Sequence, residues 1–372
     1  MFERPQSNEL AVLVHLHFAK NEDREVIEEF KELALAAGAL PQCLITGKQI
    51  KPSAHYFVGL GKVEEIQAAL TTHQAKLVLF NHNLSPSQER NLEKRLQCRV
   101  LGRIGLILDI FAQRAHSFEG KLQVKLAQLH HTATRLVRGW THLERQRGGI
   151  GLRGPGETQL ETDKRLIQQQ IKIIKKRLDK VQKQRAQSQR ARRKSQLRHI
   201  SLIGYTNTGK STLFNALTGA EVFAADQPFA TLDPSIRRLR TIDGKMVVLA
   251  DTVGFIRQLP HHLVEAFSAT LEETQQADLL LHVVDATRQD KMDREKEVNK
   301  VLQQIQAEKI PQLFVYNKID LLLAPALPHL ERNRFGLPHR VWLSAHQKQG
   351  FDLLHQAITE LLFTQNPKKR LI

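Results

Sequence analysis

The sequence predicts an α/β protein in three parts, and the distribution of its apolar and glycine residues supports this division. Over residues 1–115, short apolar runs alternate with amphipathic segments, as in a small α/β domain. Two seams of apolar residues at helical spacing flank a glycine-rich segment at 147–156, which predicts a long antiparallel helical hairpin over 116–197. A larger α/β domain is expected at 198–365, followed by a short C-terminal tail at 366–372.

The first part contains two apolar runs, 11–18 and 76–80, that we expect to form strands, and an amphipathic segment, 23–37, that we expect to form a helix. Gly59 and Gly61 precede Lys62 in a pattern that could hold a phosphate. We interpret it instead as a tight strand-to-helix turn, because so short a pattern is common in turns.

The prediction of a helical hairpin rests on apolar residues that recur three and four positions apart. They are Leu122, Leu126, Leu129, Ala133, Leu136, Trp140 and Leu143 before the glycine-rich segment, and Ile167, Ile171, Ile174, Leu178 and Val181 after it. Neither helix can bury so narrow a stripe alone, so we expect the two to pack together. Gly149, Gly151 and Gly154 match the dinucleotide-binding spacing, but that motif must follow a strand, so we interpret this segment as a slim tip.

Basic residues are concentrated in the second half of the hairpin. The chain has 55 Lys and Arg residues against 38 Asp and Glu residues, a formal net charge of +17, and residues 164–198 hold fourteen basic residues against one acidic residue. Such a stretch predicts an RNA partner, whereas an ordinary solvated helix face mixes both signs. The residues that we expect to contact RNA are Arg147, Gly149, Arg153, Gly154, Lys164 and Arg165.

The third part opens with a phosphate-binding motif, G-x-x-x-x-G-K-[ST], between a predicted strand at 199–203 and a predicted helix at 211–217. It reads Gly204, Tyr205, Thr206, Asn207, Thr208, Gly209, Lys210 and Ser211, and Thr212 follows in the helix. In such a loop, backbone N–H groups surround the phosphates, the lysine reaches the β and γ oxygens, and the serine hydroxyl reaches Mg²⁺. Alone, the loop leaves kinase, ATPase and GTPase open.

Three further motifs follow in order. Asp251 and Gly254 end an apolar run and place a carboxylate for Mg²⁺ and a glycine amide for the γ-phosphate. The next run ends in Asn317, Lys318, Ile319 and Asp320. The carboxylate of Asp320 can accept hydrogen bonds from N1–H and the 2-amino group of guanine, donors that adenine lacks. Ser344 and Ala345 then back the guanine ring, so the four motifs together predict GTP or GDP as the ligand.

Three other positions bear on GTP hydrolysis. Thr231 is our candidate for a nucleotide-sensing Mg²⁺ ligand, with Phe229 beside it at the nucleotide. Asn207 stands where potassium-activated GTPases carry an asparagine, so K⁺ is a candidate monovalent cation at this residue. Phe255 occupies the position where many GTPases place the glutamine that orients water, so intrinsic hydrolysis should be slow and stimulated by a partner. The alternative is a binding switch without turnover.

Two cysteines, Cys43 and Cys98, cannot form a disulfide framework, and no apolar run approaches the 18 or more residues of a membrane helix. We therefore expect a cytoplasmic, monomeric protein in a reduced compartment, with no membrane span.

Together these features resemble the bacterial HflX GTPases, whose glycine-rich signature is similar to residues 147–163 and whose switch sequence is similar to 229–234. The resemblance implies a factor that binds the 50S subunit and splits stalled or stressed 70S ribosomes, with the hairpin reaching 23S rRNA. Members often continue into a small C-terminal domain, and Thr208 stands where they usually carry alanine. From the residues alone, two alternatives stay open: an RNA-binding assembly or regulatory module that uses GTP only as an occupancy switch, and a switch acting on a protein effector.

Overall fold

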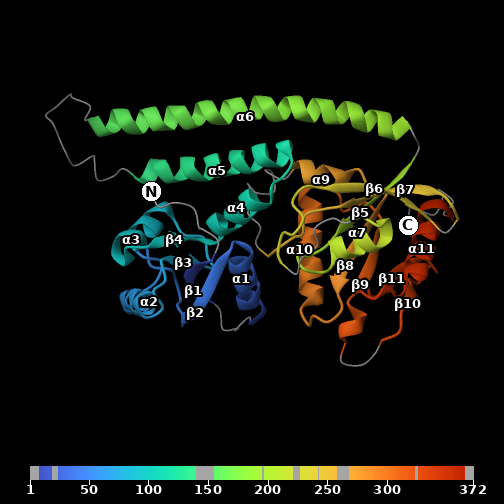
Figure 1. The fold of residues 1–372 in the computed structure, drawn as a ribbon, viewed down its shortest axis with the longest axis horizontal. Helices are drawn as coiled ribbons and strands as arrows, with labels where there is room; N and C mark the ends of the chain where they lie inside the picture. The colour runs from blue at the N-terminus through green and yellow to red at the C-terminus, as the bar shows by residue number, and fades with distance from the viewer. Residues whose placement is uncertain are drawn as a thin grey trace. The chain divides into compact units, whose positions relative to one another are not determined.

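The computed structural model describes residues 8–18, 24–139, 155–194, 197–220, 227–241, 243–257, 268–322 and 326–364 (Figure 1). The chain forms two compact units, Met1–Val181 and Gln182–Ile372. Each unit contains its own sheet and its own apolar core, so the expected α/β class is confirmed for both.

The first unit is built on a four-stranded parallel sheet with the order β2-β1-β3-β4. Its elements are β1 (Glu9–His17), α1 (Arg24–Ala36), β2 (Ala39–Lys48), α2 (Leu60–Thr72), β3 (Leu77–Phe80), α3 (Pro86–Leu96), β4 (Arg99–Leu101) and α4 (Arg103–Arg114). The central strands β1 and β3 read as nearly continuous apolar runs because both faces of a parallel sheet are covered. The strands and the helix expected here correspond to β1, β3 and α1.

The glycine pair before Lys62 marks the start of a helix: Gly59 precedes α2 and Gly61 lies in its first turn. Gly59 is the N-cap residue of α2, and the Lys62 ammonium donates to the Thr46 carbonyl at 2.9 Å and to Glu65 at 2.6 Å. The lysine is thus paired within its own unit. No described contact directs it toward a phosphate.

Buried polar side chains gather where β1 and β3 end. Arg103 donates to Asn81 Oδ1 at 2.6 Å and also pairs with Glu29, while Asn81 Nδ2 lies 3.1 Å from His15 Nδ1. The His15 ring stacks on His82, with the ring centroids 5.1 Å apart. The contact with Arg103 orients the Asn81 amide so that its Nδ2 faces His15 Nδ1.

The hairpin consists of α5 (Phe118–Gly139) and α6 (Pro155–Lys194), which Figure 1 shows side by side. Leu122 packs with Ile174 and Leu178 of α6, and Leu126 and Leu129 complete this cluster. The predicted seams therefore meet at these five residues. Trp140 and Leu143 lie outside the described residues.

The glycine-rich tip was expected to run to residue 156, but α6 already begins at Pro155. Proline suits the first turn of a helix, where its missing N–H has no helical partner to lose. Arg135 of α5 pairs with Glu89, which anchors α5 on α3 within the first unit.

The second unit contains a seven-stranded sheet with the order β10-β11-β9-β8-β5-β7-β6. Its strands are β5 (Arg198–Ile203), β6 (Ser235–Arg240), β7 (Met246–Asp251), β8 (Leu279–Asp285), β9 (Gln312–Asn317), β10 (His329–Arg332) and β11 (Pro338–Trp342). Its helices are α7 (Lys210–Thr218), α9 (Ser268–Gln275), α10 (Lys291–Gln304) and α11 (Phe351–Thr359), with a 3₁₀ turn η2 (Ile319–Leu321) and a π-helical turn η3 (Glu360–Thr364).

The five inner strands of this sheet are parallel, and β6 and β10 pair antiparallel at its two edges. Arginines mark both edges: Arg237, Arg238 and Arg240 are exposed on β6, and Arg332 is exposed on β10. Among the helices described in either unit, none is long and apolar enough to cross a membrane.

The histidine at the end of β3 makes the stability of the first unit depend on pH. His82 Nε2 accepts from the Leu16 N–H at 3.0 Å, and burial lowers the pKa of His82 from 6.5 to about 4, with repulsion from His15, Arg103 and His17 adding to the effect. As the pH falls below 6.5, the unfolded chain takes up a proton that the folded chain refuses. We expect β1 and β3 to lose up to about 3 kcal/mol between pH 6.5 and 4.

Hydrogen-exchange protection factors for peptides of β1 and β3 measure this loss in the full chain. His82→Gln should flatten the profile in this window, because glutamine does not titrate. Equal pH slopes for the two proteins would contradict the assignment to His82.

Candidate nucleotide-binding site

Four strands of the second unit bring the predicted motifs to one edge of the sheet. β5, β7, β8 and β9 are parallel neighbours and end at Ile203, Asp251, Asp285 and Asn317, respectively. The carboxyl ends of such strands form the ligand-binding edge of an open α/β sheet. Motifs separated by more than a hundred residues in the sequence therefore meet here.

The phosphate-binding loop requires glycine at two positions. Gly204 has φ +144°, and a Cβ there would lie 2.3 Å from the Val283 carbonyl oxygen. Gly209 has φ +86°, and a Cβ there would lie 2.4 Å from the Asn317 amide nitrogen. α7 begins directly after it at Lys210, so the first N–H groups of the helix face the loop.

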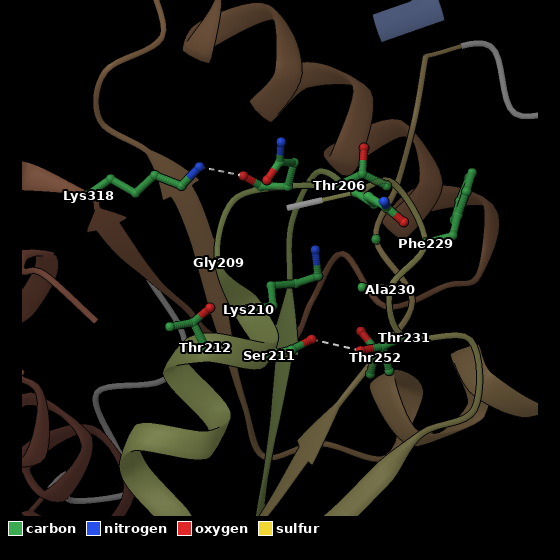
Figure 2. Close-up of a pocket in the computed structure, with 13 residues that line it drawn as sticks. Thr206, Gly209, Lys210, Ser211, Thr212, Phe229, Ala230, Thr231, Thr252 and Lys318 are labelled. Atoms are coloured by element: carbon green, nitrogen blue, oxygen red, sulfur yellow. Dashed lines mark hydrogen bonds between the residues drawn. The ribbon is translucent and has the colours of Figure 1, made fainter. Parts of the chain in front are cut away.

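The loop surrounds a cavity of about 160 Å³, shown in Figure 2. Its lining comprises Thr206, Asn207, Gly209, Lys210, Ser211, Thr212, Gln227, Phe229, Ala230, Thr231, Thr252, Gly254 and Lys318. Sequence reasoning had not named Gln227, Ala230 and Thr252. Gln227 and Ala230 lie within two residues of the predicted Phe229 and Thr231, and Thr252 lies inside the third motif. Their closeness in sequence to predicted residues is the only feature that could have indicated them.

Lys210 points from the start of α7 into this cavity (Figure 2) and is almost fully buried. Its ammonium donates to the Tyr205 carbonyl at 2.6 Å. Burial lowers the pKa of Lys210 to about 8, against the attraction of Asp251, and Lys318 adds to the lowering. A buried cation with one protein acceptor suits an anionic ligand, because phosphate oxygens would replace its lost hydration.

Three oxygen-bearing side chains meet beside Lys210. Ser211 Oγ and Thr231 Oγ1 lie 2.7 Å apart, and their hydroxyls donate to Asp251 Oδ2 at 2.8 and 2.9 Å. The other carboxylate oxygen, Oδ1, is buried and has no hydrogen-bond partner among the described residues. Burial raises the pKa of Asp251, and Lys210 and both hydroxyl donors oppose that rise.

This oxygen cluster fits Mg²⁺. The ion prefers an octahedron of oxygens at about 2.0–2.1 Å, whose neighbouring ligands lie roughly 3 Å apart, close to the spacing seen here. An unpartnered buried carboxylate oxygen is costly without a cation or a proton. The predicted magnesium ligands are therefore brought together by the fold.

The side-chain amide of Asn317 connects separate segments of the site. Its Nδ2 donates to the Thr208 carbonyl at 3.0 Å, and its Oδ1 accepts from the Ala345 N–H at 2.9 Å. One amide thus links the phosphate-binding loop, the end of β9 and the turn after β11. Asn317 belongs to the same predicted motif as Asp320, and in the structure its amide holds these segments of the site together.

The predicted guanine-binding residues follow two neighbouring strands, β9 and β11, and Lys318 lines the cavity. Asp320 Oδ1 is buried without a hydrogen-bond partner among the described residues. Lys318 donates to the Asn207 carbonyl at 2.8 Å and pairs with Asp285 at 2.9 Å, while Ser344 is fully buried next to Ala345. A buried carboxylate oxygen with unused acceptor capacity suits the paired N–H donors of guanine.

The third motif is packed tightly against the loop. A Cβ on Gly254 would lie 2.8 Å from Thr206 Cγ2, 2.9 Å from Thr206 Cα and 3.0 Å from the Lys210 ammonium. The next residue, Phe255, is only 2% exposed, so its side chain belongs to the core.

Comparison with known proteins agrees with this geometry. Three family models match successive parts of the chain: GTP-binding GTPase N-terminal over residues 24–112, GTP-binding GTPase Middle Region over 114–193, and 50S ribosome-binding GTPase over 199–318. The GTPase HflX of Escherichia coli strain K12 is 56% identical over 362 residues, which cover 97% of this chain and 85% of that protein. The chain belongs to the HflX family of GTPases.

A second HflX GTPase, from Caldanaerobacter subterraneus, is 46% identical over 366 residues, which cover 98% of this chain and 83% of that protein. A GTP-binding protein from the archaeon Sulfolobus solfataricus, solved with GDP, shares the fold with a TM-score of 0.51 at 22% identity, over 95% of this chain and 98% of its own. Membership of the HflX family makes this chain a GTP-binding protein that hydrolyses GTP. The guanine nucleotide predicted from the four motifs is thereby confirmed as the ligand.

The residues expected to contact RNA are placed only in part. Lys164 and Arg165 lie exposed on α6. Arg147, Gly149, Arg153 and Gly154 fall outside the described residues.

Gly254→Ala tests the contact between the third motif and the loop. The added methyl group would push the backbone away from Thr206, and the Gly254 amide would move from the γ-phosphate position. We expect single-turnover GTP hydrolysis to fall about 10²-fold, while the Kd for GDP, which has no γ-phosphate, changes much less.

A matched control is Gly61→Ala in α2, where a Cβ meets nothing within 4 Å. It should leave both quantities unchanged. Wild-type turnover in Gly254→Ala would show that this backbone contact is not needed.

Proposed function

We propose that this HflX GTPase binds the 50S subunit and splits stalled or stress-arrested 70S ribosomes in its GTP-bound state. The observation that carries the proposal is the basic surface of α6, in a chain that also contains a GTP site. The match of residues 199–318 to a model described as a 50S ribosome-binding GTPase supports the same partner.

The basic surface of α6 faces solvent along the described part of the helix. Ile174 and Leu178 are buried toward α5, which leaves the cations between and beside them outside the seam. Those exposed cations are Lys164, Arg165, Lys172, Lys175, Lys176, Arg177, Lys180 and Lys183. A row of cations interrupted only by Asp179 suits the phosphates of 23S rRNA, with the tip residues 147–154 as a proposed continuation.

In the proposed GTP complex, each motif has a defined task. Lys210 and the loop amides bind the phosphates, Asp320 binds guanine, and Ser344 and Ala345 back the base. Ser211, Thr231 and Asp251 would hold Mg²⁺, which neutralises phosphate charge when it is bound. The Asn207 side chain, on the cavity wall, is the proposed ligand for K⁺.

GTP would order Thr231 and Gly254, which both face the γ-phosphate position. The ordering of these two residues favours the ribosome-binding state of the protein. Hydrolysis of GTP then releases the protein from the ribosome. Because Phe255 is buried and cannot orient water, we propose slow intrinsic turnover that the 50S subunit accelerates.

The buried Phe255 also favours a second candidate, an RNA-binding assembly or regulatory module in which GTP only reports occupancy. Both candidates place the protein in the cytoplasm as a monomer. We also propose that the chain divides into three parts, with boundaries after residues 115 and 197.

Nucleotide specificity tests the guanine assignment. Asp320→Asn replaces one acceptor with a donor, which matches xanthine rather than guanine. We expect the affinity for GTP to fall by roughly 10³-fold or more and the affinity for XTP to rise, as measured by calorimetry. The exposed carboxylate Asp352 provides the control, since Asp352→Asn should change neither affinity. Unchanged GTP binding in Asp320→Asn would remove Asp320 from the site.

Ribosome binding tests the basic surface. The triple variant K175Q/K176Q/R177Q should bind 50S subunits at least about tenfold more weakly at physiological salt, with a shallower salt dependence, because fewer phosphates are neutralised. K296Q/K300Q, which removes exposed lysines from α10, should bind like the wild type. Both variants should keep the wild-type affinity for GTP.

Sedimentation of 70S particles with saturating GTP-bound protein separates the two candidate functions. Conversion to 30S and 50S subunits supports splitting. Intact 70S particles that co-sediment with the protein support the occupancy module, and turnover that 50S subunits do not stimulate contradicts partner activation.

A further inference from the structure

The segment that follows Asp251 is paired with the phosphate-binding loop beyond the ends of both strands. We call this segment, residues 252–257, switch II. Thr252 Oγ1 donates to the Leu202 carbonyl at 2.6 Å, the Phe255 N–H donates to the Gly204 carbonyl at 3.1 Å, and the Thr206 N–H donates to the Phe255 carbonyl at 2.8 Å.

The pairing slips by one residue between Asp251 and Phe255. Within the strands Leu202 is opposite Asp251, whereas beyond them Tyr205 is opposite Phe255. Switch II therefore carries one extra residue between these pairs. Gly254 lies within this irregular stretch, where its backbone approaches Thr206 closely. The position of the Gly254 amide depends on how firmly the pairs on both sides hold.

The outer pair is held by a side chain. The Tyr205 hydroxyl accepts from the Arg257 N–H at 2.6 Å, and Tyr205 is only 2% exposed. The carbonyl of the same residue accepts from Lys210. Tyr205 thus touches the phosphate-binding lysine with its backbone and the end of switch II with its phenol.

A buried ion-pair cluster fixes the phenol and switch II to the start of α10. The Arg294 guanidinium lies over the Tyr205 ring, 4.5 Å from its centroid. Asp290, the N-cap residue of α10, accepts from Arg257 at 2.9 Å and from Arg294 at 2.7 Å. A nearly buried carboxylate shared by two guanidinium groups holds both in place, since the loss of one partner leaves a costly buried charge.

We propose that Tyr205, through its phenol, and Asp290 are positioning residues for GTP hydrolysis. They hold switch II against the phosphate-binding loop so that the Gly254 amide faces the γ-phosphate. The need for them follows from Phe255: with that side chain in the core, switch II contributes backbone geometry rather than a water-orienting side chain. The proposal rests on the GTPase activity of the family and on the proposed role of Gly254.

Tyr205→Phe is the sharpest test, because it keeps the ring under Arg294 and removes the hydroxyl that accepts from the Arg257 N–H. We expect kcat to fall about 3- to 10-fold, the range that one lost hydrogen bond allows. The Kd values for GDP and for a GTP analogue should change less than about twofold, because the loop contacts nucleotide through its backbone. The midpoint of thermal unfolding should stay near that of the wild type.

Asp290→Asn provides the second arm, with Asp293→Asn as its control on the same helix. Asp293 is exposed and pairs only with the exposed Lys296 in the described structure. Asp290→Asn should lower kcat, and Asp293→Asn should not. The double variant Y205F/D290N should lose less than the product of the single effects, since both side chains hold the same segment.

The wild-type rate establishes separately that the chain hydrolyses GTP. Given that activity, an unchanged kcat in Tyr205→Phe overturns the proposal. So does a loss of kcat matched by equal losses in GDP and GTP-analogue affinity, which would indicate general damage to the loop. A fall in kcat for Asp293→Asn as large as that for Asp290→Asn would also overturn it. If Asp290→Asn does not fold, Tyr205→Phe still decides.

Discussion

The buried carboxylate of Asp251 is the constraint on which the nucleotide site depends. It ends β7, is fully buried, and accepts hydrogen bonds from Ser211 of α7 and Thr231 of the loop before β6. Its remaining oxygen lacks a described partner, and burial disfavours its charge. A site arranged in this way calls for compensating positive charge, which Lys210 supplies in part and a bound Mg²⁺ would complete.

Much of this site could be predicted from the sequence because its residues follow strands. Gly204, Asp251 and Asn317 each come directly after an apolar run, and adjacent parallel strands place their carboxyl ends together. The helical seams were predictable for a similar reason: Leu122 and Ile174 recur with the period of a helix, and a stripe of that kind must find a partner.

Other contacts could not be predicted because no local pattern encodes them. The cluster of Arg257, Asp290 and Arg294 depends on side chains from separate segments, and each charge read alone resembles a surface residue. The connecting role of the Asn317 amide depends on where Thr208 and Ala345 come to lie in the folded chain. The start of α6 at Pro155 could not be separated from the tip, because Pro155 stands between Gly154 and Gly156 and such a run is typical of turns.

The arginines at the margins of the large sheet have a consequence for self-association. An unpaired strand edge is a template on which a second chain can add a strand and begin to aggregate. Here the outer strand β6 presents Arg237, Arg238 and Arg240 to solvent. Two copies approaching through this margin would bring like charges within a few ångströms of each other, so these arginines oppose pairing of two chains along β6.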